Sequence, residues 1–126
     1  MSTAYVDTSC LVAIALGEPG ADTIARRLER HDRLISSNLL EAEFRAALKR
    51  EGVASDFDML NGFAWILPSR PLRDEIGRVL EARRLRGAGC WHLATALYLA
   101  EDPSELAFLT MDAAQRRVAE ALGFRI

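Results

Sequence analysis

The sequence of 126 residues has no excess of charge of either sign, since 16 basic and 18 acidic residues give a formal net charge of -2. Charge alone therefore does not mark the chain as a nucleic-acid-binding protein. It has only two cysteines, Cys10 and Cys90, which lie in apolar stretches and are interpreted as buried free thiols rather than a disulfide framework. No uncharged run approaches the length of a membrane span, and the N-terminus does not resemble a secretory signal. These absences predict a cytoplasmic protein with no membrane segment.

Lysine is almost absent as well, because Lys49 is the only one and every other basic residue is an arginine. The planar guanidinium of Arg suits phosphate, but genome composition gives the same bias and is the stronger explanation. Half of the residues are apolar and 27% are charged, as is ordinary for a soluble globular protein. The length, together with the lack of repeats and linkers, predicts one domain over residues 1–126 with a substantial core.

Short apolar runs alternate with helical patterns along the chain. Helices are predicted over residues 9–16, 21–31, 38–50, 55–63, 71–86, 90–100 and 113–122, and a break is predicted at 87–89. Strands are predicted over residues 3–6, 33–36, 65–67 and 106–110, with 124–126 as a last edge strand. This alternation predicts an α/β fold in which a central parallel sheet is covered by helices on both faces.

Two acidic residues, Asp7 and Asp112, each follow a predicted strand and precede a predicted helix. The carboxyl ends of parallel strands are where ligands collect in open α/β sheets. Each residue also has a purely structural interpretation as a helix N-cap, and residues 112–115 have the pattern of a capping box. Taken singly, each residue leaves both interpretations open.

The predicted helix over residues 38–50 contains two glutamates on different faces. Glu41 falls outside the apolar face and can pair with Arg45 one turn later on the surface. Glu43 falls within the apolar arc, where a carboxylate is costly unless it is paired or bound to a metal. An internal salt bridge from Glu43 to Arg50 is the structural alternative.

The three acids together change the interpretation. Several carboxylates that share one pocket repel one another unless a hard divalent cation lies between them. Oxygen-only ligands suit magnesium or manganese, and such sites commonly promote phosphodiester hydrolysis. We therefore expect Asp7, Glu43 and Asp112 to meet in a metal site.

Four short motifs, in order and at suitable spacing, resemble those of the PIN domain. They are Asp7-Thr8-Ser9, residues 36–43 with the sequence SSNLLEAE, residues 92–96 with the sequence HLATA, and residues 109–112 with the sequence LTMD. Length and motif order are similar to the VapC-type ribonuclease toxins of bacterial and archaeal toxin–antitoxin pairs. The resemblance implies a three-layer α/β/α fold, cleavage of RNA with Mg2+ or Mn2+, a cognate antitoxin and a homodimer. By matching position, the family's catalytic and metal-binding acids would be Asp7, Glu43 and Asp112, supported by Thr8, Ser9 and Thr110.

The sequence departs from the PIN pattern at Gly89, where the family usually has an Asp three residues before His92. Three carboxylates can still hold one metal ion if waters and a substrate phosphate complete its shell. We therefore expect one weakly held metal in the free protein. The alternative is a catalytically weakened PIN-like domain that binds RNA or an antitoxin without cutting.

Two further groups of residues near this departure have a structural and a functional interpretation. His92 is interpreted as a residue packed in its helix rather than a catalytic one. Arg83, Arg84 and Arg86 could contact the RNA backbone, although a run of solvated charges is the alternative.

Overall fold

The computed structural model describes residues 2–54 and 57–126, and its four strands form one parallel sheet. The strand order is β3-β2-β1-β4, so β1 pairs with β2 on one side and with β4 on the other. The strands are β1 (Thr3–Val6), β2 (Arg33–Ser37), β3 (Phe63–Ile66) and β4 (Ala107–Leu109). The predicted parallel sheet is confirmed. The last edge strand predicted over residues 124–126 is wrong, because this segment meets the sheet only through an isolated bridge from Arg125 to Ala107.

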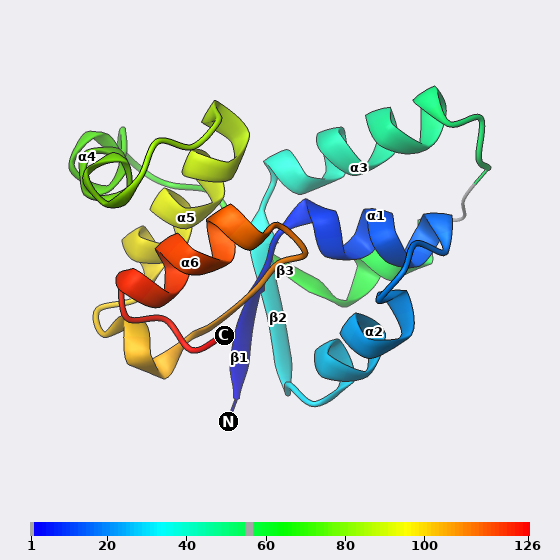
Figure 1. Cartoon of the computed structure of the whole chain (residues 1–126), viewed down its shortest axis with the longest axis horizontal. Helices are drawn as coiled ribbons and strands as arrows, with labels where there is room; N and C mark the ends of the chain where they lie inside the picture. Colours follow the sequence, from blue (N-terminus) through cyan, green and yellow to red (C-terminus); the bar gives the residue numbers. More distant parts are fainter. Residues whose placement is uncertain (1, 55–56) are drawn as a thin grey trace.

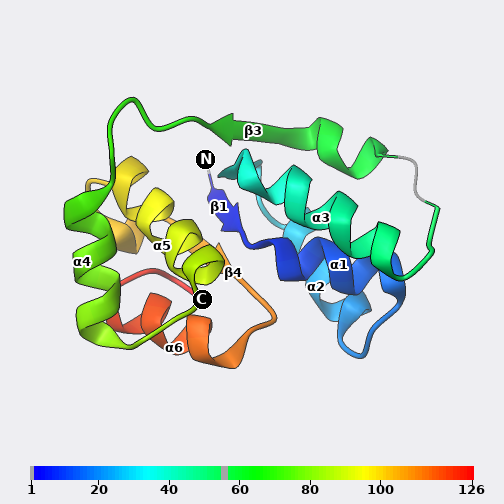
Figure 2. The same ribbon diagram turned by 90° about the horizontal axis from the view of Figure 1, so that it is seen from above.

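Helices cover both faces of this sheet, as the alternation of elements predicts (Figures 1 and 2). One layer contains α1 (Thr8–Leu16), α2 (Ala21–Glu29) and α3 (Leu39–Arg50). The other contains α4 (Arg73–Ala82), α5 (Gly87–Leu99) and α6 (Ala113–Ala121), with short 3-10 turns η1 (Asp58–Gly62) and η2 (Pro103–Glu105) between elements. Among the described residues, no helix combines the length and apolar character needed to cross a membrane.

Side chains that alternate along the central strands supply two separate apolar cores. Tyr5 of β1 and Phe108 of β4 point to the layer of α4, α5 and α6, where their rings stack with centroids 5.2 Å apart. Ala4 and Val6 point the other way, into the core formed with α1, α2 and α3. Because β1 is buried on both faces, its residues form a continuous apolar run. That run ends at Asp7, the first charged residue of the sequence.

Several predicted boundaries are wrong, including the start of β3, which is Phe63 rather than Trp65. Gly87–Gly89 form the first turn of α5 instead of a break. The backbone of the N-cap residue, Arg86, is extended, so the helix begins directly after it. The buried apolar residues later in α5 hold this helix in the core. The preceding helix α4 ends at Ala82, so residues 83–86 form an extended connection. The helix predicted over 55–63 is reduced to η1, because Phe63 begins β3; Ser55 and Asp56, at the start of that prediction, lie outside the described residues.

Candidate functional site

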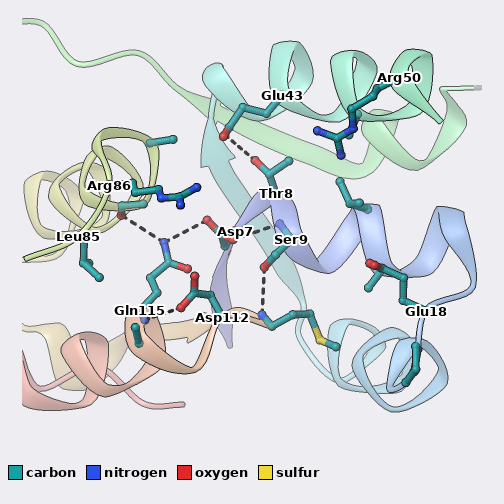
Figure 3. A pocket seen from close by; sticks show the side chains of 18 of the residues that line it. Asp7, Thr8, Ser9, Glu18, Glu43, Arg50, Leu85, Arg86, Asp112 and Gln115 are labelled. Carbon is teal, nitrogen blue, oxygen red and sulfur yellow. Dashed lines mark hydrogen bonds between the residues drawn. The ribbon is translucent and has the colours of Figure 1, made fainter.

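A pocket of about 800 Å³ lies at the carboxyl end of the sheet, between the two helical layers (Figure 3). All three predicted acids, Asp7, Glu43 and Asp112, line it. Asp7 follows β1 and Asp112 follows β4, and these two strands are hydrogen-bonded neighbours. Glu43 comes from α3, which packs against α1 on the other side of the pocket. The structure therefore brings together acids that are up to 105 positions apart in the sequence.

Asp7 serves as a helix cap and also lines the pocket, so its two interpretations are compatible. Its Oδ2 accepts a hydrogen bond from the backbone N–H of Ser9 at 3.1 Å, which caps α1. Its Oδ1 accepts one from Gln115 Nε2 at 3.1 Å. The residue is only 7% exposed, and the start of a helix favours its negative charge. The carboxylate is therefore held from both sides.

Glu43 is paired with a histidine and a threonine instead of with Arg50. Its Oε1 accepts hydrogen bonds from Thr8 Oγ1 at 2.8 Å and from His92 Nε2 at 2.7 Å. Partial burial raises the pKa of this carboxyl, but the bonds from His92 and Thr8 outweigh burial and leave the pKa below its ordinary value. Glu43 is therefore ionised at neutral pH. Arg50 instead bonds Glu51 at 3.3 Å, so the salt bridge considered from the sequence is wrong.

The contrast between the two glutamates of α3 follows the predicted helical phase. Glu41 is exposed and forms an ion pair with Arg45, in which Arg45 Nη1 lies 3.0 Å from Glu41 Oε2. Glu43, two residues later, points toward the pocket (Figure 3). Both of these geometric predictions are confirmed.

His92 lies next to both Glu43 and Asp7, and contacts at its two ring nitrogens hold the ring in one orientation. It is 1% exposed, as its packed interpretation predicts, but its Nε2 lies 2.7 Å from Glu43 Oε1 and 3.9 Å from Asp7 Oδ1. Its Nδ1 lies 2.7 Å from the hydroxyl of Tyr5. Burial raises the pKa of Tyr5 far above its ordinary value, so the phenol keeps its proton and can donate it to Nδ1. The remaining proton on Nε2 then faces Glu43.

Asp112 is exposed and caps α6, with its Oδ1 accepting from the backbone N–H of Gln115 at 2.9 Å. The reciprocal half of the predicted capping box does not form. The Asp112 N–H instead donates to Thr110 Oγ1 at 3.0 Å, because the Gln115 side chain points into the pocket wall. Ser9 supports the same turn, since its Oγ lies 3.2 Å from Thr110 Oγ1 and accepts from the N–H of Met111 at 3.0 Å.

Gln115 is a site residue that the sequence interpretation missed. It is 2% exposed, and its Nε2 donates to Asp7 Oδ1 at 3.1 Å and to the Gly89 carbonyl at 3.2 Å. Its Oε1 accepts from the Thr110 hydroxyl. The available signal was its phase on α6, because Gln115 lies three and four residues before the buried Val118 and Ala119. A polar side chain on that face needs a buried partner.

The donor set at this pocket suits a hard divalent cation, although the protein ligands are few. Among residues 2–54 and 57–126, no three Asp, Glu, His or Cys side chains form a ready-made metal cluster. Magnesium is usually held by one or two carboxylates, with waters and substrate phosphates completing its shell. Asp7 and Glu43 both lie beside His92 Nε2, and Asp112 lines the same pocket. The oxygen donors thus fit a metal whose shell is completed from solution.

Arginines also line the pocket, opposite one another across its acids. Arg86 reaches it from the α4–α5 connection, and Arg50 reaches it from the end of α3 (Figure 3). Arg84, of the same connection as Arg86, also lines the pocket. Arg83 is not part of this lining in the described chain. From the sequence, Arg84 and Arg86 are either RNA contacts or solvated charges, and Arg50 enters only as the alternative salt-bridge partner of Glu43.

Comparisons with known proteins agree on one family over almost the whole chain. The model of the PIN domain family matches residues 4–121. Ribonuclease VapC46 of Mycobacterium tuberculosis (strain ATCC 25618 / H37Rv) is 30% identical over 129 aligned residues, which cover 100% of this chain and 97% of that protein. No solved structure matches the chain at a comparable level of significance. The matched residues include every acid that lines the pocket.

Proposed function

The chain belongs to the PIN domain family, and on that premise we propose that it is a metal-dependent endoribonuclease that hydrolyses RNA phosphodiester bonds. The similarity to a ribonuclease over the full length of the chain supports the reaction class. The observation that carries the proposal is the convergence of Asp7 and Glu43 on one imidazole nitrogen in a pocket that Asp112 also lines.

The biological setting is part of the same proposal and rests on the similarity to a VapC protein. We propose that the chain is the toxin of a toxin–antitoxin pair, with RNA as its substrate and a cognate antitoxin as its protein partner. We further propose a single cytoplasmic domain over residues 1–126 that forms a homodimer.

Asp7, Glu43 and Asp112 would hold Mg2+ or Mn2+, which supplies charge stabilisation and an activated water when it is bound. The residues of the chain prepare that site. Glu43 stays ionised because His92 and Thr8 donate to Oε1. The Ser9 N–H and the Gln115 amide fix both oxygens of Asp7. Fixed carboxylates need no reorganisation during the reaction, which is the usual source of electrostatic catalysis.

The arginines around the pocket would position the RNA. Arg86 lies on one side and Arg50 on the other, so a phosphodiester between them would pass over the acids. Arg84, two residues before Arg86, also lines the pocket. A guanidinium can donate two parallel hydrogen bonds to one phosphate. Arg83, which lies beside Arg84 in the exposed connection, would contact the RNA backbone further from the cleaved bond. Hydrolysis would form a bond from the water oxygen to phosphorus and break the bond from phosphorus to one ester oxygen, which leaves as a hydroxyl after taking up a proton equivalent to the one that the water loses.

Cleavage assays with Mg2+ and Mn2+ test the proposal. We expect Asp7→Asn, Glu43→Gln and Asp112→Asn each to lower the cleavage rate by about 10²–10⁴-fold, as is typical when a proton-transfer or charge-stabilising group is removed. Circular dichroism should show that each variant is folded. Glu41→Gln is the matched control, because its exposed pair with Arg45 contributes only about 0.3–0.5 kcal/mol.

Unchanged cleavage by Asp7→Asn would refute the assignment of the site. If the wild-type protein binds RNA but does not cleave it in saturating Mn2+, the alternative function is supported instead. That alternative is a PIN domain that captures RNA or an antitoxin without cutting, and it is motivated by Gly89, which offers the pocket a carbonyl and no carboxylate.

A further inference from the structure

We propose that Gln115 is a positioning residue that holds the Asp7 carboxylate in the orientation needed for metal binding; this inference rests on the proposed metal-dependent function. Gln115 does not need to touch the metal or the RNA for this role. It acts through Asp7, to which its side-chain amide donates at 3.1 Å.

The hydrogen bonds around Gln115 permit only one orientation of its amide. Nε2 uses its two protons on Asp7 Oδ1 and on the Gly89 carbonyl, and Oε1 accepts from the Thr110 hydroxyl. A flipped amide would place its oxygen against two acceptors, the Asp7 carboxylate and the Gly89 carbonyl. At 2% exposure, water could not easily compensate for those lost bonds. The amide is therefore locked with its donors toward Asp7.

The same amide joins three elements that enclose the pocket. Gln115 belongs to α6, Asp7 follows β1 and caps α1, and Gly89 lies in the first turn of α5. A Cβ atom at position 89 would lie 3.7 Å from Gln115 Nε2, which is an ordinary van der Waals distance. Position 89 therefore borders the Gln115 amide, and a Cβ atom there would fit against it without displacing it. Any polar side chain at position 89 would emerge next to that amide.

A neutral donor has a definite advantage at this position. It orders a buried carboxylate without adding the positive charge that would compete with a divalent cation. Each carboxylate oxygen has two lone pairs, so Asp7 Oδ1 can accept from Gln115 and still face the pocket. Hydrogen-bonding partners that orient metal ligands commonly change metal affinity by about 10–100-fold.

Manganese calorimetry on the full chain tests the role of the amide. Gln115→Leu removes the donor but keeps a side chain of similar size, and we expect its Mn2+ affinity to fall by about 10–100-fold. Val118→Ala is the control, because it weakens the buried face of the same helix while leaving the Gln115 amide intact. We expect Val118→Ala to lose stability but to keep wild-type Mn2+ affinity. Wild-type affinity in folded Gln115→Leu would overturn the proposal.

A second measurement needs neither metal nor a substitution of Gln115. Gln115 is the only glutamine in the sequence, so glutamine-specific 15N labelling gives a single side-chain amide signal pair by NMR. In metal-free wild-type protein, we expect both side-chain protons to exchange slowly with water, and we expect Asp7→Asn to shift the signal of the proton donated to Asp7. Rapidly exchanging protons, or side-chain signals that Asp7→Asn leaves unchanged, would overturn the proposal. If the wild-type protein binds no Mn2+, the proposed metal dependence fails, while this measurement still decides whether Gln115 holds Asp7.

Discussion

At the scale of single residues, a chain of hydrogen bonds runs from the core to the pocket. The backbone N–H of Ser37 donates to the Tyr5 hydroxyl, which contacts His92, whose other nitrogen contacts Glu43. Buried polar groups stabilise a fold only when all of them find partners, and a partly broken network is worse than an apolar one. Removing the central imidazole should therefore be costly even though the residue lies in an apolar helix.

We expect His92→Leu to lower the free energy of unfolding by about 1–3 kcal/mol, because it leaves the Tyr5 hydroxyl without its partner on Nδ1 and removes one donor from Glu43. Urea denaturation measures the change. Glu41→Gln, on the exposed face of α3, should stay within about 0.5 kcal/mol of the wild type. A loss below about 0.5 kcal/mol for His92→Leu would show that the imidazole is dispensable for this network.

The helical phase of α3 was enough to predict from the sequence that Glu43 points inward and Glu41 outward. It was not enough to identify the partner of Glu43. Arg50 lies seven residues along the same helix, a rise of roughly 10 Å, and it bonds its neighbour Glu51 instead. The actual partner, His92, lies on α5 in the other layer. Periodicity describes one helix at a time, so it cannot predict a contact between helices that meet only in the folded sheet.

At the scale of elements, the type of each long segment could be predicted, and the errors fall at its ends. Gly87 and Gly89 were interpreted as a break, since glycine disfavours helix interiors. In the structure they occupy the first turn of α5, where tertiary contacts decide the boundary. One such contact is the bond from Gln115 to the Gly89 carbonyl. Side-chain contacts of this kind leave no local pattern in the sequence.

Helix α4 is anchored at its start by an ion pair with a predictable pH dependence. Arg70 donates to both oxygens of Glu75, with Nη1 3.1 Å from Oε1. The bond from Arg70 outweighs burial and holds the pKa of the Glu75 carboxyl below its ordinary value. A lowered pKa in the folded state adds stability that is complete above the unfolded pKa, at about 4.3, and is lost as the pH falls through the folded pKa.

We therefore expect the difference in unfolding free energy between the wild type and Glu75→Gln to be constant near neutral pH and to shrink as the pH falls below about 4.3. Urea denaturation at a series of pH values measures this difference. Asp74→Asn is the control on the same turn, because Asp74 is exposed where Glu75 is buried. A difference that does not change with pH would mean that the Arg70 pair does not set the protonation of Glu75.

At the scale of the whole molecule, the pocket is where the two helical layers meet. Its acids come from both: Asp7 and Glu43 border the layer of α1 and α3, and Asp112 caps α6 in the opposite layer. A cation bound by these acids would add a further link between the two layers, beside the hydrogen bonds from Gln115 to Asp7 and from the Met111 N–H to Ser9. Binding to the folded state alone raises the unfolding free energy, by about 2.7 kcal/mol when the ligand is present at 100 times its Kd. Tighter metal binding should therefore appear as a higher unfolding free energy of the whole chain when the metal is present.

Position 89 is where this link can be strengthened. In Gly89→Asp, a carboxylate in the first turn of α5 would emerge beside the Gln115 amide, at the helix end that favours negative charge. Without metal, its repulsion with Asp7 should offset that gain and lower the melting temperature. With Mn2+, the same charge becomes a fourth oxygen ligand, so the rise in melting temperature should exceed that of the wild type. Gly89→Asn has the same shape without the charge and should behave like the wild type. Equal Mn2+-dependent shifts for Gly89→Asp and Gly89→Asn would show that a charge at position 89 does not reach the site.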